Sequence, residues 1–191
     1  GSLIAIIHFF WKDLIDFTNN KIIWILIIIG SLPIIIFGYF VFNYNLYENI
    51  PELQVIAWST LIFGLLLYFS DKFDASKSFN NNLNIKNILI IGLFQVLALI
   101  PGASRSGIVI TGSRFLNFNR FDATKISFIL SIPALLGASI LTLKDSFFIE
   151  KTFSLNILFS ILFSYIFSYL TIKYFLIYIK NFSLNIFVIY R

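Results

Sequence analysis

Long apolar stretches without charged residues are the feature that most constrains how this 191-residue chain folds. Residues 21–42, for example, hold no charged side chain after Lys21. A helix needs about 20 apolar residues to cross a hydrocarbon layer about 30 Å thick. Because 59% of the residues are hydrophobic and only 12% are charged, water alone cannot solvate the folded chain. The sequence therefore predicts an all-α, polytopic transmembrane helical bundle and excludes a water-soluble enzyme.

The charged and metal-binding residue types exclude several further classes of protein. The net charge is +5, but the 14 Lys and Arg residues are spread thinly between apolar segments and form no basic stripe for nucleic acid. The chain has no Cys, which excludes disulfides, thiolate catalysis and Cys-ligated metals. His8 is the single His, so the sequence contains no site built from two imidazoles.

Short polar loops divide the chain into apolar segments, which we expect at residues 2–11, 21–42, 53–69, 88–100, 126–143 and 155–179. Gly30 and Pro33 are expected to loosen the middle of the second segment. The chain starts within an apolar segment that is too short to cross, and residues 184–191 begin another that stops at Arg191. We therefore expect residues 1–191 to be a single membrane domain that is truncated at both ends.

Residues 88–116 are predicted to form a re-entrant helical hairpin. The arms before and after the break at Pro101-Gly102 are each about 12 or 13 residues long, too short to cross a bilayer. Lys and Arg favour the cytoplasmic side of a membrane, and they occur at both ends of this segment, in residues 70–87 and 114–125. Residues 43–51 carry neither and are expected outside. The hairpin should therefore enter and leave on the cytoplasmic side.

Residues 101–107 read PGASRSG and form the candidate site. An Arg at membrane depth is costly without a partner, so Arg105 indicates a functional role, most simply binding of an anion. Ser104 or Ser106 can cap the outgoing helix, whose free N–H groups and positive dipole end then favour phosphate. The planar guanidinium of Arg105 can bind two phosphate oxygens at once. Small residues in membrane helices usually indicate close packing, but Arg105 favours the phosphate site.

Other residues near the motif are assigned by position. Gly102, Ala103 and Gly107 are expected to line the phosphate site, with Gly107 keeping one helix face open. Thr111 lies about two turns beyond Ser104 and should share its face, and Gln95 should point into the hairpin from the other arm. Four charged residues are given ordinary roles: Arg114 and Arg120 as interfacial residues, and Asp71 and Asp74 as loop charges.

The motif and its surroundings resemble the undecaprenyl-diphosphate phosphatase family, also called bacitracin-resistance proteins. GLFQVLALI precedes the motif and ITGSRFLNFNRFDATKISFILSIPALLGAS follows it. Weaker matches, in the same order as in the family, occur at residues 1–13, 30–38, 127–138 and 185–191. The fold implied is an inverted repeat with two re-entrant hairpins, in keeping with a faint similarity between residues 32–38 and 132–137.

The activity that this resemblance implies is hydrolysis of a C55 polyprenyl diphosphate to the monophosphate and inorganic phosphate, which recycles the carrier lipid for peptidoglycan synthesis. Arg105 would bind the diphosphate and stabilise charge on the transferred phosphoryl group, while Ser104 and Ser106 would hold phosphate oxygens, and one of them could take part in the chemistry. The resemblance also implies a divalent cation, Mg or Ca, and a multi-pass location in the bacterial inner membrane. The partners are the lipid and the bilayer, with no nucleic acid, and a homodimer is left open.

Two departures from the family pattern affect these roles. The family reads PGxSRSxxT, but its Thr position is Val109 here, and Thr111 lies two residues further on, about 200° around the helix. The family's first motif, two glutamates followed by Pro-x-Ser-Ser-x-Gly-His, lies ahead of Gly1. It would supply the metal ligands and the nucleophile or base, so no metal ligand is assigned in this chain and we expect the fragment alone to be inactive.

Three alternatives remain. Discontinuous helices and a buried Arg also suit a polyprenyl-lipid or anion transporter of the inverted-repeat type. A second class of membrane lipid phosphatase pairs a Ser-Arg element with two catalytic histidines, which His8 alone does not provide. The third alternative is a purely structural membrane subunit, for which Arg105 would be dispensable.

Overall fold

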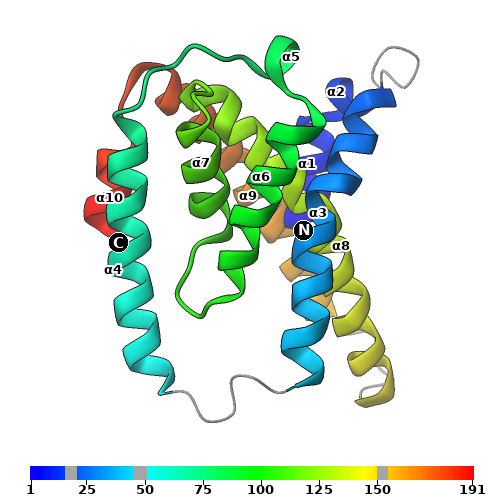
Figure 1. The fold of residues 1–191 in the computed structure, drawn as a ribbon. Helices are drawn as coiled ribbons and strands as arrows, with labels where there is room; N and C mark the ends of the chain where they lie inside the picture. Colours follow the sequence, from blue (N-terminus) through cyan, green and yellow to red (C-terminus); the bar gives the residue numbers. More distant parts are fainter. Residues whose placement is uncertain (16–20, 45–50, 150–154) are drawn as a thin grey trace.

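The computed structural model describes residues 1–191 except 16–20, 45–50 and 150–154. Its regular elements within this part of the chain are helices: α1 (Ser2–Phe9), α2 (Trp11–Ile15), α3 (Lys21–Asn43), α4 (Glu52–Asp71), α5 (Phe79–Asn82), α6 (Ile85–Val96), the 3-10 turn η1 (Leu97–Leu99), α7 (Arg105–Phe115), α8 (Arg120–Ile149), α9 (Leu155–Asn181) and α10 (Asn185–Tyr190). The prediction of a polytopic helical bundle is confirmed (Figure 1).

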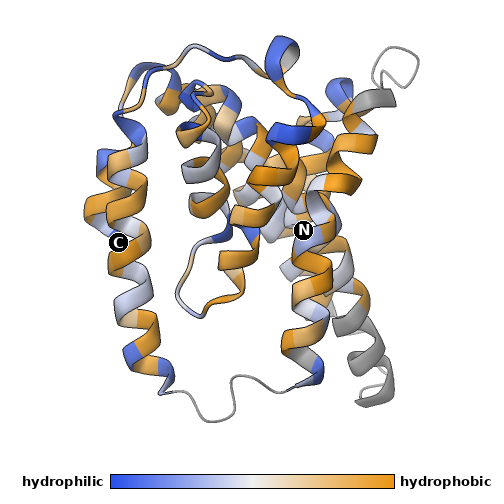
Figure 2. Cartoon of the chain, viewed as in Figure 1, coloured by the Kyte–Doolittle hydropathy of each residue, from blue (hydrophilic) through white to orange (hydrophobic). Residues whose placement is uncertain are grey.

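Four described helices are long and apolar enough to cross a membrane. Their candidate spans are Ile23–Val41 in α3, Glu52–Asp71 in α4, Arg120–Ile140 in α8 and Ile157–Asn181 in α9. Large apolar side chains are exposed along these helices, as expected where lipid replaces water as the solvent. Hydrophilic segments gather mainly at the two ends of the bundle (Figure 2).

The re-entrant hairpin predicted at residues 88–116 is present as α6, η1 and α7. Both open ends of the hairpin lie at the same end of the bundle as α5 (Figure 1). Its tip contacts α4, because a Cβ atom added to Gly102 would lie 2.8 Å from the Cα of Ile56. Since Ile56 belongs to the half of α4 that begins at Glu52, the tip passes the middle of the bundle without crossing it.

The two ends of the bundle differ as the loop charges predict. The segments after α4 and α7 lie at one end, together with α2, whereas α3 ends and α4 begins at the other end (Figure 1). The Lys- and Arg-bearing loops therefore share one side. That this side is cytoplasmic stays a prediction.

Close packing between α3 and α6 fixes one side of the hairpin. A Cβ atom on Gly92 would lie 2.3 Å from the carbonyl oxygen of Gly30, so the two backbones meet directly. Small residues permit this approach in membrane bundles. Gly30 thus serves helix packing, whereas α3 continues as a helix through Pro33. On its other side the hairpin packs against α8, with Val109 and Ile110 in the buried core.

Candidate functional site

The hairpin tip is shaped by a glycine turn that α4 holds in place. The 3-10 turn η1 ends at Leu99, and Gly102 follows with φ +85°, a conformation that residues with a Cβ rarely adopt. Ser59 of α4 donates a hydrogen bond to the carbonyl oxygen of Pro101 at 2.6 Å. A Cβ atom on Gly102 would lie 2.5 Å from the Ser59 hydroxyl oxygen. The tip therefore requires glycine for both its conformation and its contacts.

The N-terminal cap of α7 is Ser104 rather than Ser106. Its backbone is extended, and its hydroxyl accepts a hydrogen bond from the N–H of Gly107 at 3.2 Å. The Ser106 hydroxyl oxygen lies 3.2 Å from that of Ser104. Ser127 of α8 donates to the carbonyl oxygen of Ser106 at 3.3 Å. The two hydroxyls thus lie beside the positive end of an 11-residue helix, where the N–H groups of the first turn favour an anion.

Arg105 is half-buried at the first position of α7. Its guanidinium group makes no hydrogen bond or ion pair with any residue that the structure describes. This differs from Arg114, at the other end of the same helix, which contacts a carboxylate. A guanidinium without a carboxylate inside an apolar bundle is left to bind an anion from outside the chain.

A hollow of about 300 Å³ opens beside the motif serines. Ser104, Ser106 and Gly107 form part of its polar edge, and side chains of α4, α7, α9 and α10 complete it. Arg105 does not line this hollow, although it is the neighbour of both serines. The motif therefore presents its hydroxyls and its arginine in different directions from the same helical turn.

Besides Arg105, four predicted site residues lie outside the lining of this hollow: Gln95, Gly102, Ala103 and Thr111. Thr111 is buried and donates its hydroxyl hydrogen to the carbonyl oxygen of Gly107 at 2.8 Å. Gln95 is fully buried, and its amide nitrogen and oxygen have no hydrogen-bond partner among the described residues. Val109, at the family's Thr position, belongs to the apolar core. A direct phosphate contact for Gln95 or Thr111 stays a prediction.

Arg191 is a functional candidate that sequence reasoning missed. It lines the hollow with the two serines and donates from Nη2 to the carbonyl oxygen of Gly102 at 3.0 Å. Its Nη1 atom is buried and has no partner within the described part of the chain. The only sequence signal was a cation after an apolar run, which also fits an ordinary membrane-flanking charge.

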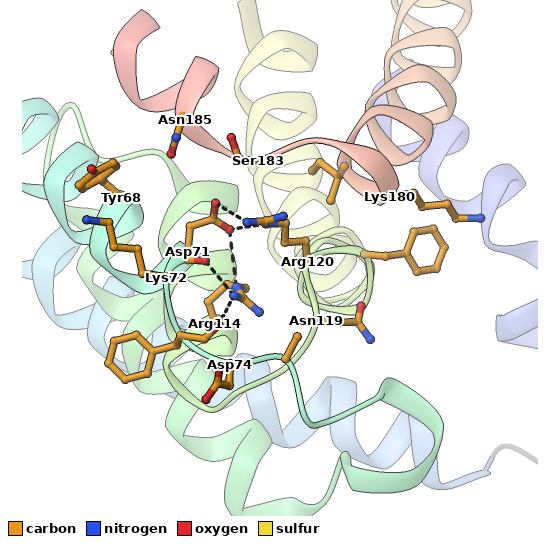
Figure 3. Close-up of a pocket in the computed structure, with 14 residues that line it drawn as sticks. Tyr68, Asp71, Lys72, Asp74, Arg114, Asn119, Arg120, Lys180, Ser183 and Asn185 are labelled. Carbon is orange, nitrogen blue, oxygen red and sulfur yellow. Dashed lines mark hydrogen bonds and ion pairs between the residues drawn. The ribbon is translucent and has the colours of Figure 1, made fainter.

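A larger hollow, of about 890 Å³, lies at the open end of the hairpin (Figure 3). Its central charges are one carboxylate and two guanidinium groups that contact it. Arg120 donates to both carboxylate oxygens of Asp71, at 2.6 and 3.0 Å, and Arg114 lies 3.7 Å from the same carboxylate. The Arg114 guanidinium also donates to the backbone carbonyl oxygens of Asp71, Phe73 and Phe118.

The roles expected for Asp71 and Arg114 are therefore wrong. Asp71 is a buried residue at the end of α4, not a loop charge. Arg114 is a buried ion-pair partner of Asp71, not an interfacial residue. Arg120 is partly exposed and also pairs with Asp71, and its interfacial position stays a prediction. Because Asp71 and backbone carbonyl groups already bind these two arginines, this hollow is a weaker candidate for the phosphate site than the hairpin tip.

The donor atoms at the tip do not fit a divalent cation. Within the described residues there is no group of three or more His, Cys, Asp or Glu side chains that could hold a metal ion. The groups that meet at the tip are hydroxyls, N–H groups and guanidinium groups, which suit an anion. His8 lies elsewhere, against Tyr165 and Tyr169 of α9.

Comparisons with known proteins identify relatives along the whole chain. Residues 1–191 match the family described as bacitracin resistance protein BacA. The chain is 55% identical over 196 residues to the undecaprenyl-diphosphatase of Pelagibacter ubique (strain HTCC1062), and this match covers all of the chain and 75% of that protein. It is 37% identical to the undecaprenyl-diphosphatase of Elusimicrobium minutum (strain Pei191), covering all of the chain and 76% of the relative. A 35% identical match to that of Jannaschia sp. (strain CCS1) covers 73% of the chain and 57% of the relative. The chain belongs to the BacA family of bacitracin resistance proteins.

Proposed function

We infer that this protein is an undecaprenyl-diphosphatase, a membrane phosphatase that hydrolyses undecaprenyl diphosphate to undecaprenyl phosphate and inorganic phosphate. Membership of the BacA family and the name shared by the relatives support this activity. The four apolar helices support a lipid substrate that is met within a bilayer. We place the protein in the bacterial inner membrane and leave a homodimer as a prediction.

The proposal for the site rests on one observation: the guanidinium group of Arg105 has no carboxylate partner among the described residues. Arg105 occupies the first turn of α7, where it is half-buried. Ser104 and Ser106 contribute two hydroxyls from the same helical turn, and the helix dipole adds positive potential. A diphosphate, with several anionic oxygens, satisfies all of these groups together.

The reaction cleaves one phosphoanhydride bond. Water supplies the oxygen that joins the terminal phosphorus, the bond from that phosphorus to the bridging oxygen breaks, and the bridging oxygen leaves as part of the monophosphate lipid. Negative charge develops on the bridging oxygen and on the transferred phosphoryl group. We assign to Arg105 the stabilisation of this charge, and to Ser104, Ser106 and the N–H groups of α7 the orientation of the phosphate oxygens.

The divalent cation implied by the sequence resemblance stays a proposal. The donor set at the hairpin tip does not fit such a cation, so no step is assigned to a metal here.

Phosphate release from a polyprenyl diphosphate in proteoliposomes tests the proposal, with the full-length gene product as the enzyme. Arg105→Lys should lower kcat/KM at least about 100-fold, because an ammonium group cannot reproduce a bidentate contact in the transition state. Lys173→Gln is the matched control, because Lys173 is an exposed cation on α9 outside the hollow. Unchanged activity of Arg105→Lys would contradict the assigned role. Lipid movement without phosphate release by the wild type would contradict the activity itself and favour a transporter.

A further inference from the structure

The first turn of α7 is flanked by two guanidinium groups of different origin. Arg105 belongs to the motif itself, whereas Arg191 follows α10 and lies 89 positions from Gly102 in the sequence. The Nη2 atom of Arg191 donates a hydrogen bond to the Gly102 carbonyl oxygen. Nη1 is buried without a partner among the described residues. A buried charged donor without an acceptor is costly, so this nitrogen has binding capacity to offer a ligand.

The free nitrogen and a motif hydroxyl converge on one small gap. A Cβ atom on Gly107 would lie 3.3 Å from Nη1 of Arg191 and also 3.3 Å from the hydroxyl oxygen of Ser104. Both polar atoms therefore border the same point, which is open because residue 107 is glycine. Two donors that border the same gap can bind different oxygens of one phosphate group.

The remaining walls of this hollow are mainly apolar. They consist of Leu67, Ile110, Phe175, Leu184, Phe187 and Tyr190. A volume of about 300 Å³ is at the lower end of the range for small-molecule sites. A polar edge formed by Arg191 and two serines, with apolar walls beyond it, suits an amphiphile that joins a phosphate to a hydrocarbon chain. Arg105, which does not line the hollow, is directed to a different part of the ligand.

We propose that Arg191 is a second substrate-binding arginine: it binds the phosphate group that carries the prenyl chain, and the hollow accepts the first part of that chain. Arg105 then binds the terminal phosphate, which is released. This inference rests on the proposed function, because it divides the two phosphates of that substrate between the two arginines. Arg191 interacts with a group that is bound before, during and after cleavage, so it contributes equally to ground-state and transition-state binding.

Inhibition by the two kinds of product distinguishes the role of Arg191 from that of Arg105. Farnesyl phosphate, a short prenyl monophosphate, and inorganic phosphate are used as inhibitors of the full-length protein in detergent. Arg191→Gln should raise the inhibition constant of farnesyl phosphate about tenfold or more, the loss expected for one charge-assisted hydrogen bond, and change that of inorganic phosphate little. KM should rise while kcat is largely retained. Arg191→Lys should recover part of the affinity, because it keeps the charge.

Gly107→Ala tests the same gap without removing a charge. Its methyl group would enter the space between Arg191 and Ser104, while alanine favours the helical backbone at this position. We expect weaker inhibition by farnesyl phosphate with no loss of thermal stability. Lys173→Gln again serves as the control for loss of one cation.

Two results would overturn the proposal. If Arg191→Gln weakens both inhibitors equally, or lowers kcat and leaves farnesyl phosphate inhibition unchanged, then Arg191 acts only through the Gly102 carbonyl group as a structural residue. Direct titration of the protein with farnesyl phosphate, followed by thermal stability, gives a readout that is independent of turnover. A wild type that binds farnesyl phosphate through Arg191 but releases no phosphate would contradict the proposed function and leave the binding assignment standing.

Discussion

Replacing Gly102 with alanine should destabilise the hairpin tip strongly. Two independent penalties apply. The backbone at this position has φ +85°, which costs an L-residue with a Cβ atom about 1–2 kcal/mol. The new Cβ atom would also lie 2.5 Å from the Ser59 hydroxyl oxygen and 2.8 Å from the backbone of Ile56. The serine side chain can rotate away, but the α4 backbone cannot do so without moving the helix.

Overpacking of this kind typically costs about 1–3 kcal/mol, so the two penalties together amount to about 2–5 kcal/mol. That is a large share of the roughly 5–15 kcal/mol by which folded proteins are usually stabilised. Activity should fall as well, because Ser104 and Arg105 follow within three residues of the displaced turn. We expect a marked decrease in Tm in detergent and a loss of phosphate release.

Gly137→Ala in α8 provides the matched control for this change. Apart from the adjacent residues and the backbone of the same helix, no heavy atom lies within 4 Å of the position of the new Cβ atom. Alanine also stabilises a helix by about 1 kcal/mol relative to glycine. Its Tm should be unchanged or slightly raised. If Gly102→Ala unfolds at the same temperature as Gly137→Ala and retains full activity, then the tip does not hold the turn described here, and the placement of the site on it is wrong.

Three further changes test other parts of the structure. Asp71→Asn leaves Arg114 buried without its carboxylate and should lower the stability by about 3–5 kcal/mol, measured by thermal unfolding; an unchanged Tm would contradict the ion pairing. Gly92→Ala should separate α3 from α6, because its Cβ atom would lie 2.3 Å from the Gly30 carbonyl oxygen; its Tm should fall below that of Gly137→Ala, and equal Tm values would contradict this close packing. Ser104→Ala removes the cap of α7 and should cost about 1 kcal/mol, with a decrease in phosphate release larger than this loss of stability explains; full activity would remove Ser104 from the site.

Much of the fold was predictable because it depends on local patterns. The lengths of residues 21–42 and 155–179 predict crossing helices, and the structure contains α3 and α9 there. The short arms around Pro101-Gly102 predict the hairpin, because neither arm can cross a bilayer alone. Ser104 was one of two possible caps, and the choice between them depended on which residue takes the extended backbone before the helix.

The candidate site was predicted only in part. The motif residues are found together at the tip, but Gln95 and Thr111 are buried outside the lining of the hollow. Counting residues along α7 places Thr111 on the same face as Ser104, whereas which face borders the hollow depends on how α7 packs against its neighbours. No sequence pattern marks Arg191 as a site residue, because its role comes from contact with a turn that is far away in the sequence.

The sequence by itself determined the solvent of this protein, the number and position of its long apolar helices, and the broken helix that carries an arginine. These features follow from hydropathy, segment length and the backbone limits of proline and glycine, all of which act over short distances along the chain. Only the tertiary structure decided which arginines are neutralised and which are left to bind a ligand. Asp71 pairs with Arg120, 49 positions away, while Arg105 has no described carboxylate partner. Such pairing depends on contacts between distant segments, which neither composition nor periodicity records.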